Sequence, residues 1–434
     1  MNITKFIKTG FNSQTLSIQP KEFFVRFYSS LSTPQHPSKK PNFPLKKKFG
    51  HIDSIKEVNK TRHSIFRATE SLDRGLFKKA EDFAVSSIKD LMKKIDLSSS
   101  LYAYPTYALG LISLKKGYYS ISESFLKDSL SRSEAIDGID RNVKNIAEST
   151  NDLGLSLLRQ GRFEESALYF FKAEKIAKDY NLDFLLPSIF SNIGEYYREL
   201  CYYDKSSNYH AKAHNYLLAF PKEQLNLARC CLNRGQVYRL SNQIEESGDF
   251  LNAGAKILTN YLNSIDSNPT PNHMDWTRFV IEFGHLYFSM GEIEKARQKF
   301  IIAKNHFISM NNSNIPDAII NMLNLAVLER NFPTLTPAQS NSYISDILAS
   351  IQTPLQKLKG LKFNTRSPRI DSVIQNLVSN PIPTSSSPIT SIDNNIKTTS
   401  AIKPKPTKVK LIEPLPFQLV LVENVPQLFQ KSLI

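Results

Sequence analysis

Two histidines and three cysteines are the side chains of this sequence best suited to metal or nucleophilic chemistry. His210 and His214 are four residues apart, a spacing that places two metal ligands on one face of a helix. No acidic or cysteine partner completes a ligand set, so we predict histidines that pack or face solvent, and no metal site. Cys201, Cys230 and Cys231 form no C-x-x-C pair, and adjacent cysteines rarely bridge each other. Their arrangement favours a reducing compartment or buried thiols.

The sequence motifs of the common enzyme classes are missing from the chain. It contains no G-x-x-x-x-G-K phosphate loop, no H-E-x-x-H metalloprotease motif, no nucleophile elbow and no set of kinase motifs. We therefore predict no catalytic residues, no cofactor and no enzymatic activity.

The net charge of +15 is carried by the two ends of the chain. Residues 1–50 contain nine basic side chains and one acidic one, and residues 352–434 contain eleven and four. The body, residues 51–351, is left with 35 of each sign and is neutral. A nucleic-acid partner would need a local basic patch on this body, or the tails, so the charge distribution disfavours nucleic acid.

The first 28 residues have the composition of a mitochondrial presequence. The first 21 include three lysines and no acid, and they lack the long apolar core of a secretory signal. Arg26, Tyr28 and Ser29 resemble the matrix-protease pattern, in which an arginine and an aromatic residue precede the cut. We predict a cleavable presequence over residues 1–28 and a disordered basic linker over 29–54. The alternative is a basic disordered tail without a targeting role.

No apolar run approaches the roughly 20 residues that span a bilayer. We expect a protein of the mitochondrial matrix or of the matrix face of the inner membrane. It would have no transmembrane span, and peripheral association with the inner membrane stays open.

A pattern of small and bulky residues recurs at intervals of 40 to 49 residues. In its clearest copy, Gly154 and Gly161 are followed by an aromatic, a small, a bulky and a small residue at fixed offsets. Nine of the 15 glycines occupy only the two columns that these two glycines define. Since glycine weakens a helix interior by about 1 kcal/mol, its recurrence requires a geometric reason. The seven copies begin at Ala68, Gly110, Gly154, Gly194, Gly235, Gly284 and Ala326.

Each copy predicts a helical hairpin. The Gly154-type residue allows a second helix to cross the first one closely, and the Gly161-type residue ends the first helix in a left-handed conformation. The second helix returns a face of small and bulky residues onto the first. Because one hairpin buries only part of its apolar surface, stacking of neighbours must complete the core.

These columns resemble the tetratricopeptide repeat (TPR), whose consensus has small, small, aromatic, small, aromatic and small residues at the same offsets. HEAT and armadillo repeats share the period but do not explain the paired glycine columns. Most units exceed the usual length of about 34 residues and resemble the long-repeat, kinesin-light-chain-like type. In organisation the chain is similar to the mitochondrial TPR protein of respiratory complex III assembly. The resemblance implies an all-α fold, a right-handed superhelical TPR-like solenoid of about seven helical hairpins over residues 55–351, with disordered basic tails.

The resemblance also implies a concave groove lined by the first helix of each hairpin. Asparagine recurs two residues before the first glycine column, and the third copy has Asp152 in that place with Asn151 beside it. An asparagine amide there can donate to and accept from an extended peptide backbone. Arginine recurs six residues before the same column. The alternatives are asparagines that link neighbouring helices, and exposed helical charges. The implied groove residues are Asn151, Asn192, Glu195, Arg198, Arg229, Asn233, Gln236, Arg239, Arg278, His285 and Asn324.

The repeat pattern ends near residue 352. Residues 352–410 are rich in Ser, Pro and Lys, and we predict a mostly disordered linker. Residues 411–434 are apolar again. They are either a sticky terminal tail or a docking segment for a partner or for the protein's own groove.

Two functions are compatible with this organisation. The first is a mitochondrial protein-interaction scaffold or assembly factor that holds a partner peptide or helix in the groove, with respiratory-complex assembly as one setting. The alternative is an organellar RNA-binding or translation factor that uses the same kind of solenoid with its basic tails. The neutral body favours the first, and neither function identifies the partner.

Overall fold

The computed structural model describes residues 51–92, 100–135, 142–220, 222–265, 273–313, 315–359 and 368–382. The chain divides into two units, Met1–Ser54 and Ile55–Ile434, and the fold reported below belongs to the second. The predicted presequence with its cleavage residues, and the apolar segment 411–434, lie outside the described residues.

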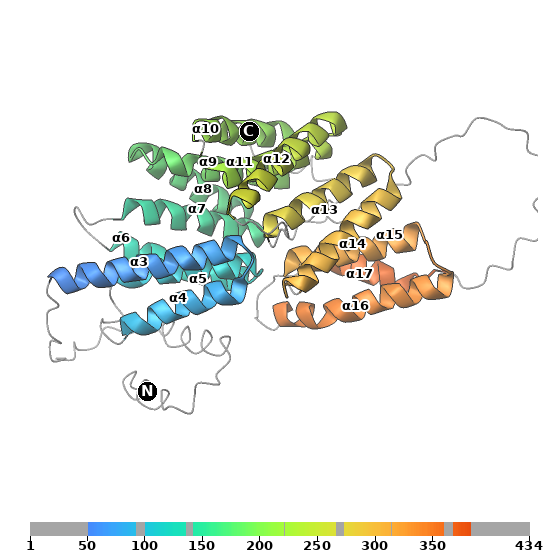
Figure 1. The fold of residues 1–434 in the computed structure, drawn as a ribbon, viewed down its shortest axis with the longest axis horizontal. Coiled ribbons are helices and arrows are strands. Elements are labelled where there is room, and N and C mark those ends of the chain that lie inside the picture. Colours follow the sequence, from blue (N-terminus) through green and yellow to red (C-terminus); the bar gives the residue numbers. More distant parts are fainter. Residues whose placement is uncertain are drawn as a thin grey trace, which may run out of the picture. The chain divides into compact units, whose positions relative to one another are not determined.

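Seven helical hairpins follow one another along the described chain (Figure 1). The odd-numbered helices α3 to α15 are the first helices of the hairpins, the even-numbered helices α4 to α16 are the second ones, and α17 follows. The bounds are α3 His51–Asp73, α4 Phe77–Met92, α5 Ala103–Lys115, α6 Tyr119–Glu134, α7 Val143–Arg159, α8 Phe163–Asp179, α9 Leu186–Glu199, α10 Tyr203–Leu218, α11 Gln224–Leu240, α12 Ile244–Ile265, α13 Met274–Ser289, α14 Ile293–Ser309, α15 Pro316–Asn331, α16 Pro337–Lys359 and α17 Pro368–Ser379. The part of the chain that the structure describes has no strand, and the predicted all-α solenoid of about seven hairpins is confirmed.

The first glycine column marks the place where a bulky side chain of the second helix rests on the first helix. A Cβ added at Gly154 would lie 2.8 Å from Cδ1 of Phe170, which is fully buried. The hydroxyl of Ser166 donates to the Gly154 carbonyl oxygen at 2.9 Å and joins the two helices at the same point. The column therefore makes room for a side chain, and the small residue opposite it adds a hydrogen bond. Equivalent pairs are Gly110 with Leu126, Gly194 with His210, Gly235 with Leu251, and Gly284 with Phe300.

The second glycine column ends the first helix, as predicted. Gly161 has a φ of +76°, and its amide donates to the Leu158 carbonyl oxygen at 3.0 Å. The amide of Arg162 donates to the Leu157 carbonyl oxygen, also at 3.0 Å, which completes the hydrogen-bond pattern of a left-handed helix end. Cys201 and Asn242 occupy this column in the fourth and fifth hairpins and keep the positive φ.

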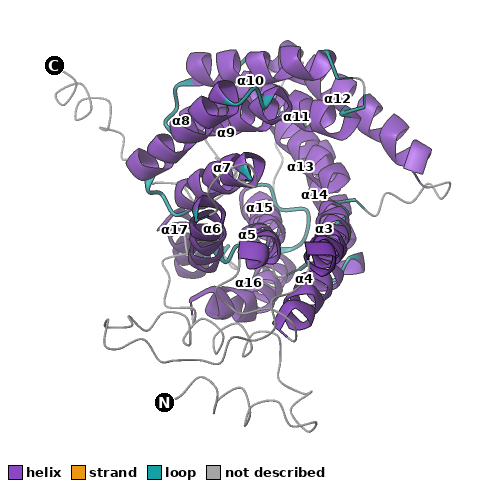
Figure 2. Cartoon of the chain, turned by 90° about the vertical axis from the view of Figure 1, so that its left-hand side faces the viewer, coloured by secondary structure: helices purple, strands orange, loops and turns teal. Residues whose placement is uncertain are grey.

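Within this unit the solenoid curls so that the first hairpin touches later ones. Asn312, which follows α14, donates its side-chain amide to the carbonyl oxygen of Gly75, between α3 and α4, at 2.9 Å. Met274 and Met310 lie against the same glycine. Figures 1 and 2 show the end of α3 beside α13 and α14. Residues far apart in sequence thus enclose one interior.

The last hairpin is covered by α17. Helix α15 is buried from Ala318 to Glu329, whereas a surface helix buries only one stripe. Asn341 of α16 and Ile382, just beyond α17, exchange two hydrogen bonds of 2.9 Å. Part of the segment 352–410, which the sequence predicts to be mostly disordered, therefore packs as the end of the array.

None of the helices in the described ranges is both long and apolar enough to cross a membrane.

Candidate functional site

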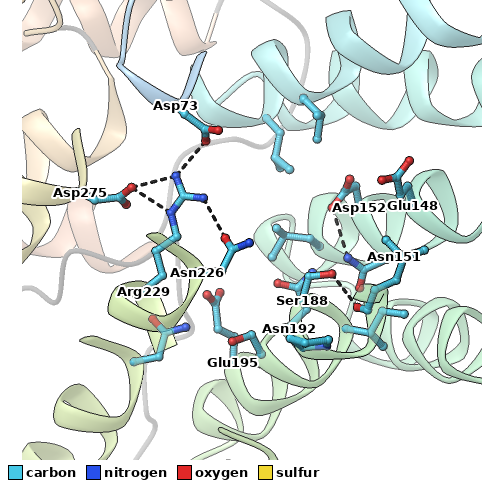
Figure 3. Close-up of a pocket in the computed structure, with 18 of the residues that line it drawn as sticks. Asp73, Glu148, Asn151, Asp152, Ser188, Asn192, Glu195, Asn226, Arg229 and Asp275 are labelled. Carbon is cyan, nitrogen blue, oxygen red and sulfur yellow. Dashed lines mark hydrogen bonds and ion pairs between the residues drawn. The ribbon is translucent and has the colours of Figure 1, made fainter. Parts of the chain in front are cut away.

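A pocket of about 440 Å³ lies inside the curl of the second unit. Its walls come from the first helices of six hairpins, α3, α5, α7, α9, α11 and α13, with a contribution from the loops before α9 and α11. Stacking places these helices side by side on the concave surface, so equivalent columns of the repeat face one space. Figure 3 shows part of this lining.

Seven of the eleven sequence-predicted groove residues line this pocket. Four are amides and three are charged. They are Asn151, Asn192, Glu195, Arg229, Asn233, Gln236 and Arg278. Their contact with a ligand stays a prediction.

The other four predicted groove residues lie in the packing between helices. Arg198 donates to Gln236 and pairs with Glu199, Nη2 to Oε1, at 2.8 Å. Arg239 pairs with Glu282 of the next hairpin at 2.5 Å between Nε and Oε1. The buried ring of His285 meets Phe300 edge-on, and Asn324 is buried within α15. These four side chains therefore make contacts between or within helices, and none of them lines the pocket.

The wall formed by α11 and α13 is a network of ion pairs (Figure 3). Arg229 holds Asp73 and Asp275 with N to O distances of 2.8 Å each. Arg278 lies 3.4 Å from Asp275 and 3.4 Å from Asp317. Burial alone would raise the pKa of Asp275, but the charges of Arg229 and Arg278 hold it well below its usual range. This wall is ionised and internally paired.

The wall formed by α5 and α7 carries Glu148 and Asp152, and the one ion pair that the described residues make with either is a long one, from Lys144 to Glu148. Tyr107 donates its hydroxyl to Asp152 at 2.7 Å, and the Asn151 amide donates to the same carboxylate at 3.3 Å. Burial raises the pKa of Asp152 to about 6, although the Tyr107 hydrogen bond and Lys115 oppose the rise. Burial also raises the pKa of Glu148 to about 7, against the charge of Lys144 3.7 Å away. These carboxylates are easily protonated near neutral pH.

The pKa of a third carboxylate, Glu195 of α9, is shifted in the opposite direction, to a lower value. Arg159 of α7 pairs with it at 2.5 Å. Burial alone would raise the pKa of Glu195, but the charges of Arg159 and Arg198 lower it to about 2. Arginine charges thus keep Glu195 and Asp275 ionised, whereas no arginine does so for Glu148 and Asp152.

Apolar side chains line the mouth of the pocket between the charged walls. Phe184 and Phe220 lie in the loops before α9 and α11, and they are 53% and 38% exposed. Leu185, Ile189 and Leu217 line the same pocket. Exposed aromatic rings beside convergent polar groups are typical of binding sites for peptides and small molecules.

Glu148 and Tyr107 line the pocket but are not among the sequence-predicted groove residues, and the repeat marks only Glu148. Glu148 lies six residues before Gly154, the same column position as Arg229 and Arg278. Comparison of that column across all seven copies, and not only at its arginines, identifies Glu148. Tyr107 lies outside the columns, and no repeat signal marks it.

The histidines and cysteines that the sequence offers for metal or nucleophilic chemistry do not gather at one site in the described residues. His210 is fully buried against Gly194, and burial lowers its pKa to about 3. Cys230 and Cys231 are buried thiols, while Cys201 is exposed in the turn after α9. Across the described ranges, no group of three or more His, Cys, Asp or Glu side chains is arranged to hold a metal ion.

Comparison with known proteins yields a likeness in fold. No protein-family model matches the chain, and no curated protein sequence matches it. A Rap protein complexed with competence and sporulation factor is 13% identical with a TM-score of 0.51, over 87% of this chain and 96% of that one. The Rap conjugation gene regulator of the plasmid pLS20, in complex with the Phr* peptide, is 13% identical with a TM-score of 0.52, over 81% and 94%. The chain has the fold of these TPR-like helical solenoids.

Proposed function

We propose that this chain is a non-enzymatic scaffold that holds a peptide segment of a partner protein in the concave pocket. The observation that carries the proposal is the convergence of six hairpins on one space of about 440 Å³ with both polar and apolar walls. The two solved structures similar in fold were determined with a factor or a peptide bound.

The chemistry of the lining suits a peptide. Asn192, Asn233 and Gln236 can each donate and accept, as an extended backbone requires. Phe184 and Phe220 offer apolar surface for side chains. The lining has seven acidic and four basic residues, and this excess of negative charge would repel phosphates, so it supports a peptide over RNA in this pocket.

The setting we propose is the mitochondrion. The acid-poor residues 1–28 and the cleavage-like pattern at Arg26, Tyr28 and Ser29 support import into the matrix. There the protein would act in the matrix or at the matrix face of the inner membrane, as an assembly factor for a respiratory complex. The long units support descent from the kinesin-light-chain-like type of TPR.

Site-specific photocrosslinking tests the proposal. A photoreactive amino acid placed at Ser188, an exposed pocket residue on α9, should crosslink a partner in intact mitochondria. The matched control carries the same amino acid at Leu168, a 72% exposed position on α8 that does not line the pocket. Equal crosslinks from both positions, or none from Ser188, would contradict a role for the pocket. Recovery of the chain only from the cytosol would contradict the proposed setting.

A further inference from the structure

The charges of the pocket do not balance among themselves. Each of the three arginines that line it is already paired with a carboxylate: Arg159 with Glu195, Arg229 with Asp73 and Asp275, and Arg278 with Asp275 and Asp317. None of them is available to neutralise further carboxylates in the pocket without breaking an existing pair.

Of the lining carboxylates without an arginine partner, Glu148 and Asp152 are partly buried and Glu223 is exposed. Glu148 and Asp152 are four residues apart on α7, so they occupy one face of the helix and point into the same part of the pocket (Figure 3). Among the described residues, no basic nitrogen lies within 4 Å of Asp152, and Glu148 has only Lys144 at 3.7 Å. Lys115 of α5, the fourth basic residue of the lining, influences Asp152 from a longer distance, and burial lowers the pKa of this lysine to about 8. A partly buried pair of carboxylates whose one ion-pair contact is 3.7 Å long is costly to ionise, and a bound cation would lower that cost.

An independent observation at the same wall points to a missing donor. Asn151 lines the pocket and is only 4% exposed. Its side-chain nitrogen donates to Asp152, but its side-chain oxygen has no hydrogen-bond partner. A buried acceptor left unpaired costs about 1–3 kcal/mol, which a ligand N–H would recover.

We propose that the wall formed by Glu148, Asp152 and Asn151 binds a lysine or arginine side chain of the partner peptide. The cation lies between the two carboxylates, and one of its N–H groups donates to the Asn151 oxygen. This assignment rests on the proposed function and names the chemistry of its ligand. The charged N–H groups of lysine or arginine make stronger hydrogen bonds to these acceptors than the N–H or O–H groups of a neutral side chain.

The acid-base properties of the wall agree with this assignment. Burial raises the pKa of both carboxylates, and the groups that face them are Lys144 on α7 and Tyr107 and Lys115 on α5. An arriving cation favours the ionised form, so binding should release protons near pH 6 to 7. Peptide affinity should therefore rise between about pH 5.5 and 7.5.

Binding to defined peptide pools tests the proposal with the purified full chain. The probes are N-terminally acetylated nonapeptide pools in which one position is fixed as Arg, Lys, norleucine or Glu, followed by fluorescence polarisation. Arg and Lys pools should bind about tenfold more tightly than the norleucine pool, as expected for about 1.4 kcal/mol. The double variant Glu148→Gln with Asp152→Asn should remove this preference. The matched control, Glu245→Gln with Glu246→Gln, changes two exposed carboxylates of α12 that do not line the pocket and should leave the preference intact.

A second probe separates the cation site from the peptide function. Binding of Nα-acetylarginine methylamide, compared with the norleucine analogue, is followed by NMR in the wild type and in the double variant. If this amide binds at the wall while no pool binds, the cation site stands and the peptide function fails. If pools bind without a basic preference, the peptide function stands and the cation site is wrong. If neither probe binds, both are wrong.

Two further outcomes would also overturn the proposal. Preference for free over acetylated N-termini, without a side-chain preference, would assign the wall to a terminal amine. Binding of Arg pools only after deletion of residues 383–434 would assign it to the chain's own lysine-rich segment, residues 403–410, and not to a partner.

Discussion

Arg229 of α11 donates to Asp73 at the end of α3, a residue 156 positions earlier in the chain, with an Nη2 to Oδ1 distance of 2.8 Å. The same guanidinium also holds Asp275 of α13. One side chain therefore joins the first hairpin to the fifth and the sixth. Its two carboxylate partners differ in burial, because the Asp275 side chain is 2% exposed and that of Asp73 is 45% exposed.

This difference predicts unequal effects of removing Arg229 and Asp73. Arg229→Ala leaves the buried Asp275 charge with only longer contacts, to Arg278 at 3.4 Å and to His273 at 3.6 Å, so it should lower the free energy of unfolding by about 2–4 kcal/mol. Asp73→Ala removes a half-exposed partner and should cost about 0–1 kcal/mol. Denaturant titration measures both. Equal losses would show that Arg229 acts mainly through Asp73.

The two glycine columns predict two different kinds of damage. Gly284→Ala places a Cβ 2.8 Å from the ring of Phe300 and should cost about 1–3 kcal/mol through overpacking. Adding Phe300→Leu to that variant should recover part of the loss. Gly161→Ala has no atom within 4 Å of its Cβ and should cost about 1 kcal/mol through its positive φ alone.

Asparagine is the control for the second column. Gly161→Asn should cost less than Gly161→Ala, because asparagine tolerates the left-handed region and already adopts it at Asn242 and Asn311. Thermal melting of the Gly161 and Gly284 variants, with and without Phe300→Leu in the latter, measures these losses of stability. A full loss in Gly284→Ala that Phe300→Leu does not relieve would argue against the packing explanation.

The acidic wall predicts an inverted pH dependence of stability. The folded-state pKa values of Glu148 and Asp152 are raised above those of the unfolded chain, so between about pH 4 and pH 7 the folded state holds protons that the unfolded state has released. The contribution of this pair to stability therefore decreases as pH rises through that range. The Glu148→Gln, Asp152→Asn variant should be more stable than the wild type at pH 7.5, by on the order of 2 kcal/mol, and the gap should close near pH 4.

The measurement for this pair is thermal melting at a series of pH values. Asp152→Asn keeps an acceptor for Tyr107, which limits other losses. If the stability difference between the double variant and the wild type grew toward acid pH, the prediction would be wrong.

His210 predicts the opposite sign in nearly the same range. Burial lowers its folded-state pKa to about 3, so below about pH 6.5 the unfolded chain binds a proton that the folded state does not. The contribution of His210 to the free energy of unfolding therefore decreases as pH falls. His210→Leu should remove this dependence and, because both ring nitrogens are buried without hydrogen-bond partners, should stabilise the fold by about 1 kcal/mol.

Leucine is a suitable replacement because Leu126 and Leu251 fill the same column over Gly110 and Gly235. Melting of wild type and His210→Leu between pH 5 and 8 separates this effect from that of the acidic wall. If the variant is less stable at every pH, the histidine makes a contact that leucine cannot replace.

The parts of the fold that could be predicted are those fixed by short-range sterics. Gly154 must accommodate Phe170 and Gly161 must take a positive φ, and both demands recur in each hairpin, so a single sequence reveals them. Column reasoning placed Asn192 and Asn233 in the pocket for the same reason.

The rest depends on how small rotations add up along the array. The contact of Arg229 with Asp73 exists because several hairpins together turn the chain back on itself, and no pair of neighbouring repeats encodes that turn. The same column can also serve packing or the pocket, depending on the next hairpin. The residue that follows the first-column glycine lines the pocket at Glu195 and Gln236, whereas at His285 it packs edge-on against Phe300.

The hydrogen bond from Asn312 to Gly75 has a consequence for how this protein can change in evolution. An open repeat array tolerates duplication or loss of a unit, because each repeat needs only its neighbours. Here the first hairpin also needs the end of the sixth at a fixed distance and angle. Insertion or deletion of one unit would move these partners apart, so the number of repeats between them is fixed by the geometry of closure.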